Sequence, residues 1–125
     1  MTQINNKVKN YDLEERTAKF GESVIEFCKH LPKTVISIPL IKQLIRSGTS
    51  IGANYMEANG ATSKKDFTHK IHLCKKEAQE TKHWLRMLTK CCPKKEEEIK
   101  KLWVEAQELT MIFQKITTSL KKKNG

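Results

Sequence analysis

Apolar residues recur at alternating spacings of four and three along four separate segments of this 125-residue chain. That spacing places an apolar stripe along one face of an α-helix. The first two stripes are Leu13, Thr17, Phe20, Val24, Phe27 and Leu31, and Ile41, Leu44, Gly48, Ile51, Tyr55 and Ala58. The other two are Phe67, Ile71, Cys74, Ala78, Thr81, Leu85 and Leu88, and Ile99, Leu102, Ala106, Leu109, Phe113, Ile116 and Leu120. We predict helices at about residues 12–31, 38–59, 64–91 and 94–122.

Residues that start and stop helices lie between these segments. Asp12, Ser37 and Ser63 are each placed to cap a helix N-terminus. The breaks between the helices fall at Pro32, Gly60 and Pro93. Such short connections force successive helices to lie side by side and antiparallel. The sequence therefore predicts one domain, residues 1–125, of the all-α class: an antiparallel up-down-up-down four-helix bundle, left-handed because the apolar repeat is seven residues.

Small side chains crowd two turns of the second predicted helix. They are Ser47, Gly48, Ser50, Gly52 and Ala53. Each glycine costs a helix about 1 kcal/mol relative to alanine, so a close contact must offset that cost. One interpretation is close approach of a neighbouring helix inside the bundle, and the other is close approach of another subunit or of a ligand backbone.

Positive charge is concentrated in the second half of the chain. Lys and Arg number 24 against 14 Asp and Glu, and residues 63–125 hold 16 of the former and 8 of the latter. This asymmetry favours an acidic partner, with nucleic acid the first candidate, although many lysine-rich helices are simply solvated.

The first ten residues are polar, and no later stretch approaches the roughly 18 apolar residues that a membrane span requires. We therefore expect a cytoplasmic protein with no membrane partner. Cys28 and Cys74 fall on apolar helix faces, and Cys91 and Cys92 are adjacent, which favours reduced thiols over disulfides.

Catalytic and metal-binding patterns are weak. His69 and His72 share a helix face, but their spacing matches no zinc pattern. A di-iron bundle needs two Glu-x-x-His motifs, and only Glu80 with His83 provides one. Cys91 and Cys92 lie at a helix C-terminus, where the dipole disfavours a thiolate. We predict no enzymatic activity, no catalytic residue, no metal and no cofactor.

Three glutamates invite a different interpretation. Arg46 and Asn54 of the second predicted helix could form polar contacts with these glutamates, which are Glu57, Glu77 and Glu80. They are either ordinary surface charges or members of a partly buried polar network that fixes the register between the second and third helices.

The pattern Arg-Ser-x-x-Ser-Ile-x-x-Asn-x-x-Glu combines small, polar and apolar positions in one helix and is realised by Arg46, Ser47, Ser50, Ile51, Asn54 and Glu57. Phe67, Glu77 and Glu80 belong to two further matching stretches, 63–67 and 77–85. Together they resemble the bacterial four-helix bundle proteins of 23S rRNA intervening sequences, also labelled S23 ribosomal proteins. Many relatives read Glu-Gly where this chain has residues 57–60, so we expect its second helix to run a turn longer.

This resemblance implies a homopentamer with a central channel, and a likeness to the accessory protein of diversity-generating retroelements, which binds nucleic acid and a reverse transcriptase. Five apolar residues outside the four stripes also favour a homo-oligomer, namely Ile45, Leu73, Trp84, Met87 and Trp103.

Our leading hypothesis is a non-enzymatic oligomer that binds structured RNA or DNA by phosphate contacts. The candidate binding residues are Lys64, Lys65, Lys75, Lys76, Arg86, Lys121, Lys122 and Lys123. The alternatives are a protein–protein adaptor, with a reverse transcriptase as one such partner, and a structural element without a nucleic-acid ligand.

Overall fold

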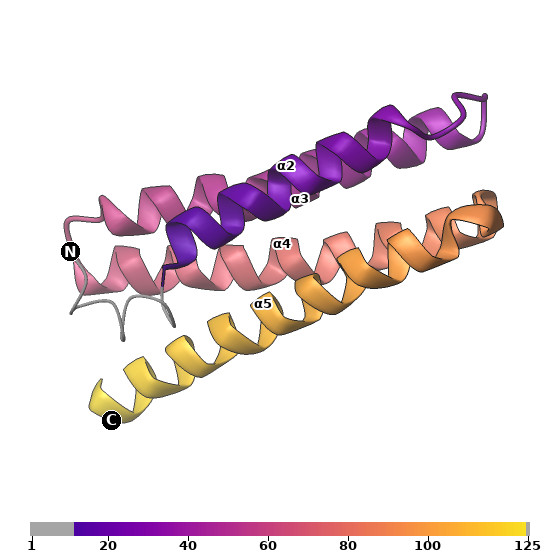
Figure 1. The fold of residues 1–125 in the computed structure, drawn as a ribbon. Helices are drawn as coiled ribbons and strands as arrows, with labels where there is room; N and C mark the ends of the chain where they lie inside the picture. The colour runs from indigo at the N-terminus through magenta and orange to yellow at the C-terminus, as the bar shows by residue number, and fades with distance from the viewer. Residues whose placement is uncertain (1–11, 125) are drawn as a thin grey trace.

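The computed structural model describes residues 12–124, which form four α-helices joined by short connections. The helices are α2 (Leu13–Lys29), α3 (Ser37–Asn59), α4 (Lys64–Cys91) and α5 (Glu96–Asn124), with a 3₁₀ turn over Pro93–Lys95. Figure 1 shows them side by side, each running opposite to the one before it. The all-α class and the four predicted helices are confirmed, whereas the left-handed supercoil stays a prediction. None of the helices in the described part of the chain combines the length and apolar character needed to cross a membrane.

Two of the three predicted caps are confirmed. Asp12 Oδ1 accepts a hydrogen bond from the Glu15 amide at 3.3 Å, and Ser63 Oγ accepts one from the Asp66 amide at 3.0 Å. The prediction for Ser37 is wrong, because Ser37 is the first residue of α3 itself. Its hydroxyl accepts from the Thr34 amide at 2.8 Å and donates to the Pro32 carbonyl at 2.6 Å, so it holds the preceding turn together.

The ends of two helices differ slightly from the prediction. Helix α2 ends at Lys29, because the amides of His30 and Leu31 bond to carbonyls only three residues back and tighten the last turn. The Lys33 ammonium then donates to the carbonyl oxygens of Cys28 at 2.7 Å and Leu31 at 2.9 Å. Helix α5 begins at Glu96 because the residues after Cys92 form the 3₁₀ turn.

The predicted apolar stripes form the core. Most of their members are buried, and Val24, Leu44, Ile51, Ile71 and Leu85 have no exposed surface at all. The stripe members that remain half-buried are Phe27, Tyr55, Phe67, Leu102, Ile116 and Leu120.

The small residues of α3 bring α2 close. A Cβ at Gly48 would meet Val24 Cγ2 at 3.0 Å, and one at Gly52 would meet Thr17 Oγ1 at 3.2 Å. A side chain at either position would meet α2 at tight distances, so the glycines permit close approach of a helix of the same bundle, which is the first of the two interpretations given above.

The four seams between neighbouring helices are unequal. Helix α3 packs along both α2 and α4, and α4 packs along α5, whereas α2 and α5 share far fewer contacts. Two shallow grooves of about 600 and 510 Å³ follow the α2–α5 seam, and Leu102 lines both of them. The bundle is therefore tightly packed on three sides and thinly closed on the fourth.

Candidate nucleic-acid interface

The outward side of α4 carries no carboxylate along its length. Its positions repeat the alternation of four and three residues seen in the core stripe, but on the opposite side of the helix. We call this surface the outer α4 face; its eight exposed members are Lys65, His69, His72, Lys76, Gln79, His83, Arg86 and Lys90. Within the described residues, none of its four Lys and Arg side chains forms an ion pair.

On the α5 side, the outer α4 face is bordered by lysines whose partners are neutral. Lys75 donates to Gln114 Oε1, and Lys82 donates to Gln107 Oε1 and also lies 5.2 Å from the centre of the Trp103 ring. An amide oxygen orients an ammonium group without cancelling its charge. These two lysines therefore add to the positive potential of the face.

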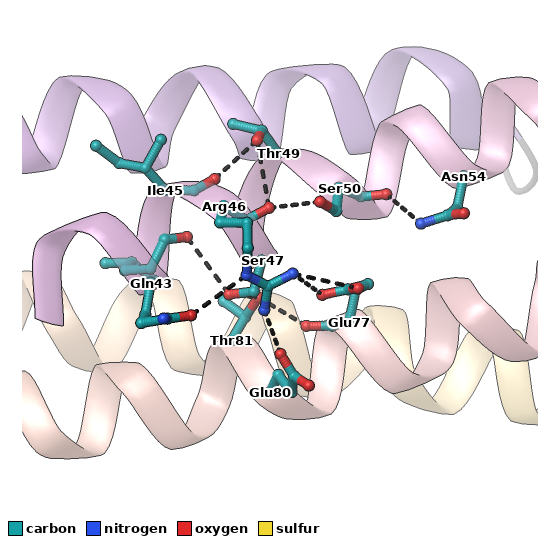
Figure 2. A network of polar contacts seen from close by, with 11 residues as sticks. Gln43, Ile45, Arg46, Ser47, Thr49, Ser50, Asn54, Glu77, Glu80 and Thr81 are labelled. Atoms are coloured by element: carbon teal, nitrogen blue, oxygen red, sulfur yellow. Dashed lines mark hydrogen bonds and ion pairs between the residues drawn. The ribbon is translucent and has the colours of Figure 1, made fainter. Parts of the chain in front are cut away.

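On the α3 side, the carboxylates that border the face already have cations. Arg46 Nη1 lies 3.2 Å from Glu77 Oε1, and Arg46 Nη2 bonds to Glu80 (Figure 2). Arg46 Nε also donates to Gln43 Oε1 at 3.3 Å. Helix α4 holds eight Lys and Arg against three Asp and Glu, and two of those three acids share this one arginine of α3 as their ion-pair partner. The uncompensated charge of α4 is thus directed outward.

Below Arg46, a buried hydroxyl pair joins the same two helices. Thr81 Oγ1 and Ser47 Oγ lie 2.9 Å apart, and neither residue is exposed to solvent (Figure 2). Thr81 also donates to the Glu77 carbonyl at 2.8 Å. Since a buried hydroxyl without a partner is costly, the pair fixes the register of α3 against α4.

The predicted network is smaller than the one we considered. Glu57 does not join Arg46, because it pairs with Lys70 at 2.8 Å, and 58% of its side chain is exposed. Ser50 donates to the Arg46 carbonyl at 2.6 Å, and Asn54 donates to the Ser50 carbonyl at 2.9 Å, so both bond within α3. Among the other motif residues, Ile51 belongs to the buried core, and the partly buried Phe67 packs against that core.

The structure divides the predicted binding residues into three groups. Lys65, Lys76 and Arg86 lie on the outer α4 face, while Lys75 lies beside it and Lys64 opens the helix. Lys121 and Lys122 are exposed near the end of α5, at the end of the bundle where α4 begins (Figure 1). The side chain of Lys123 lies outside the described residues.

Sequence reasoning missed Lys90 and the three histidines as members of one face. Applying the same alternation of four and three to the polar residues of 65–90 would have found them. It also missed a second arginine cluster, in which Arg16 of α2 lies 2.7 Å from both Glu105 and Glu108 of α5.

The cysteines and histidines form no chemical centre in the described residues. Burial raises the pKa of the Cys28 thiol to about 11 and that of Cys74 to about 12, so both are protonated at neutral pH. The cysteines are free. No three His, Cys, Asp or Glu side chains of residues 12–124 come together as metal ligands would.

The apolar residues outside the stripes are either half-buried or exposed. Ile45 and Trp84 pack against the core, and Leu73 and Met87 are half-buried. Trp103 stays 39% exposed on α5, and two further apolar residues of that helix, Val104 at 46% and Met111 at 58%, are more exposed still. Part of the exposed apolar surface therefore lies on α5, and the rest is at Ile25, Val35, Ile36, Ile38 and Met56.

Comparison with known proteins agrees with the resemblance seen in the motif. The family described as 23S rRNA-intervening sequence protein matches residues 9–115. A crystal structure of a protein of unknown function from the S23 ribosomal protein family of Bacteroides thetaiotaomicron is 30% identical, with a TM-score of 0.74, and the match covers 83% of this chain and 96% of that one. None of the curated proteins compared with the chain matches it. Since the family match includes α2, α3, α4 and most of α5, this chain belongs to the 23S rRNA-intervening sequence protein family.

Proposed function

We propose that this protein is a non-enzymatic, oligomeric four-helix protein of the cytoplasm that binds structured RNA or DNA through the outer α4 face. The observation that carries the proposal is a run of eight exposed positions on a 28-residue helix with four permanent cations and no carboxylate. Phosphate contacts of this kind supply affinity without reading base sequence.

The distribution of charge among the helices supports this surface over the others. Helix α2 has three Lys and Arg against four Asp and Glu, and α5 has six Lys against five Glu. The family description names the intervening sequences of 23S rRNA and states no ligand. Neither that description nor the one of the solved relative names an enzymatic activity.

The exposed apolar residues of α5 support a homo-oligomer, and the family resemblance favours a pentamer. Trp103 and Val104 lie about two turns from Met111. A second copy that covered them would remove an apolar surface from water. Gel filtration coupled to light scattering should give a mass several times 14.5 kDa, and a monodisperse monomer would argue against assembly. The same surface also suits an adaptor whose partner is another protein, such as a reverse transcriptase.

Fluorescence anisotropy with labelled RNA and DNA duplexes across a salt series tests nucleic-acid binding. A site with about six phosphate contacts should lose on the order of 10³ in affinity between about 50 and 200 mM salt. Replacing Lys76, Arg86 and Lys90 by Gln should reduce the slope of log affinity against log salt by about 2.7, since each contact contributes about 0.9.

A matched control removes the same charge elsewhere. Lys42, Lys100 and Lys101 are exposed on α3 and α5, and no ion pair involves them in the described residues. Replacing these three by Gln should leave most of the slope in place. Equal losses in the two triple variants would show that net charge acts rather than this face. A dissociation constant above about 10⁻⁴ M at low salt would contradict the nucleic-acid function and favour the adaptor.

A further inference from the structure

Three of the four histidines of the chain lie on the outer α4 face, between its permanent cations. His69 follows Lys65 by four residues, His72 precedes Lys76 by four, and His83 precedes Arg86 by three. Residues three or four apart are neighbours on a helix surface. Each exposed imidazole therefore has a permanent cation beside it on the face that the proposed function assigns to phosphate.

We propose that His69, His72 and His83 are themselves phosphate ligands, which bind nucleic acid as imidazolium ions and make its affinity rise as the pH falls. This inference rests on the proposed function. A neutral imidazole offers one N–H donor and no charge, whereas the protonated ring offers two donors and a positive charge. A nearby phosphate favours the protonated ring, so binding and proton uptake are linked.

The surroundings of these rings leave them available to an external anion. On their own helix, the neighbouring carboxylates are Asp66 and Glu80, each three residues before a histidine, and Glu80 is already held by Arg46. The charged groups that the flanking helices direct toward this side of α4 are Arg46 and Glu57 from α3, and Glu108 and Lys115 from α5. Among the described residues none of the three rings has a carboxylate partner within ion-pair distance, and the ring of His83 lies against that of Trp84, at 4.8 Å between centres.

His30, the fourth histidine, is in a different environment. It follows α2, where its Nδ1 atom lies 2.9 Å from the Glu26 carbonyl oxygen and 3.8 Å from a Glu26 carboxylate oxygen. A histidine that already faces a carboxylate has less to gain from an approaching phosphate. His30 is therefore a natural internal control.

Histidines also suit this face before a ligand arrives. Like charges four residues apart destabilise a helix by about 0.2–0.5 kcal/mol per pair. Lysines in place of His69 and His72 would create two such pairs, with Lys65 and Lys76. A histidine carries no permanent charge and so adds no fixed pair of this kind.

Anisotropy titrations with a short labelled RNA duplex, at about pH 8 and about pH 6 and constant ionic strength, test the inference. The wild type should bind the RNA at least about tenfold more tightly at the lower pH. The slope of log affinity against log salt should steepen by up to about 0.9 for each histidine that becomes a phosphate contact. The triple variant His69→Gln, His72→Gln, His83→Gln should keep its affinity at pH 8 and lose the pH dependence. His30→Gln should behave as the wild type.

A second triple variant keeps the test decisive if the glutamine variant is poorly folded by circular dichroism. The triple variant His69→Lys, His72→Lys, His83→Lys should bind tightly at both pH values. Equal wild-type affinities at the two pH values, or a pH dependence that survives the glutamine substitutions, would overturn the histidine role and leave the proposed function standing. Absence of binding at both pH values would overturn the proposed function and, with it, this inference.

Discussion

The α3–α4 and α2–α5 seams are each bridged by one arginine that reaches two glutamates three residues apart on the facing helix. Arg46 reaches Glu77 and Glu80 across the first seam, and Arg16 reaches Glu105 and Glu108 across the second. The two bridges look alike, but the apolar packing beneath them differs greatly. The two arginine bridges should therefore contribute differently to the stability of the two seams.

Bidentate geometry and the lower exposure of the arginine favour the Arg16 bridge, although Glu77 is more buried than Glu105. Arg16 binds Glu105 through two nitrogens, at 2.7 and 2.8 Å, and 34% of its side chain is exposed against 47% for Arg46. Hydrogen bonding to Glu105 holds the pKa of Arg16 above its ordinary value. Bidentate, partly desolvated pairs are the stronger kind of ion pair. Arg46 instead covers a seam that buried side chains already hold.

A pair of leucine truncations should separate the two seams most strongly. Leu85 of α4 has no exposed surface, whereas Leu102 of α5 is half-buried and lines the grooves of the α2–α5 seam. Leu85→Ala should lower the free energy of unfolding by about 3 kcal/mol, because it leaves a cavity. Leu102→Ala should cost about 1 kcal/mol, since less surface is lost from the interior. Urea unfolding measures both, and equal costs would mean that the α2–α5 seam is as well packed as the other.

The next largest effect on the free energy of unfolding should come from the buried hydroxyl pair, which lies at the α3–α4 seam. Thr81→Val keeps the shape of the side chain but removes the hydroxyl 2.9 Å from Ser47, whose remaining partner is the Leu44 carbonyl at 3.4 Å, so we expect a loss of about 1–2 kcal/mol. Adding Ser47→Ala should recover part of that loss, because no hydroxyl is then left unpaired. Double-mutant cycles by thermal or urea unfolding check this, and additive losses in the double variant would contradict a direct coupling.

The two arginines themselves should show the smallest difference. Arg16→Gln should cost about 1–2 kcal/mol, because the α2–α5 seam has little else to hold it. Arg46→Gln should cost less than about 1 kcal/mol, the usual range of a solvent-exposed pair. Unfolding at low and high salt would sharpen the contrast, since screening should remove more of the Arg46 contribution. A larger cost for Arg46 would reverse our ranking of the seams.

The fold was predictable because the four apolar stripes specify helices that can bury only one face each. Local capping was less predictable: Ser37 has the residue type of a cap, but its hydroxyl is engaged by Thr34 and Pro32 in the turn. A network of Arg46 with Glu77 and Glu80 is one of the two interpretations that their helix positions allow, and Glu57 and Asn54 take no part in it. The Arg16–Glu105 bridge joins residues 89 positions apart, and no local spacing records such a contact.

The outer α4 face shows a different limit of sequence reasoning. Its residues were visible as charges, but the count over residues 63–125 mixed them with the balanced charges of α5. Only the placement of Glu77 and Glu80 against Arg46, and of Lys75 and Lys82 against glutamines, shows which charges face outward uncompensated.

The thin α2–α5 seam also bears on how the chain reaches its fold. The three extensive seams join helices that are neighbours in sequence, so each can form as a local hairpin with a short loop to close. Chains dominated by such local contacts fold quickly. Only the α2–α5 seam joins the first and the last of the four helices, and we expect it to form after the folding transition state. Weakening it at Arg16 should then accelerate unfolding and leave the folding rate almost unchanged.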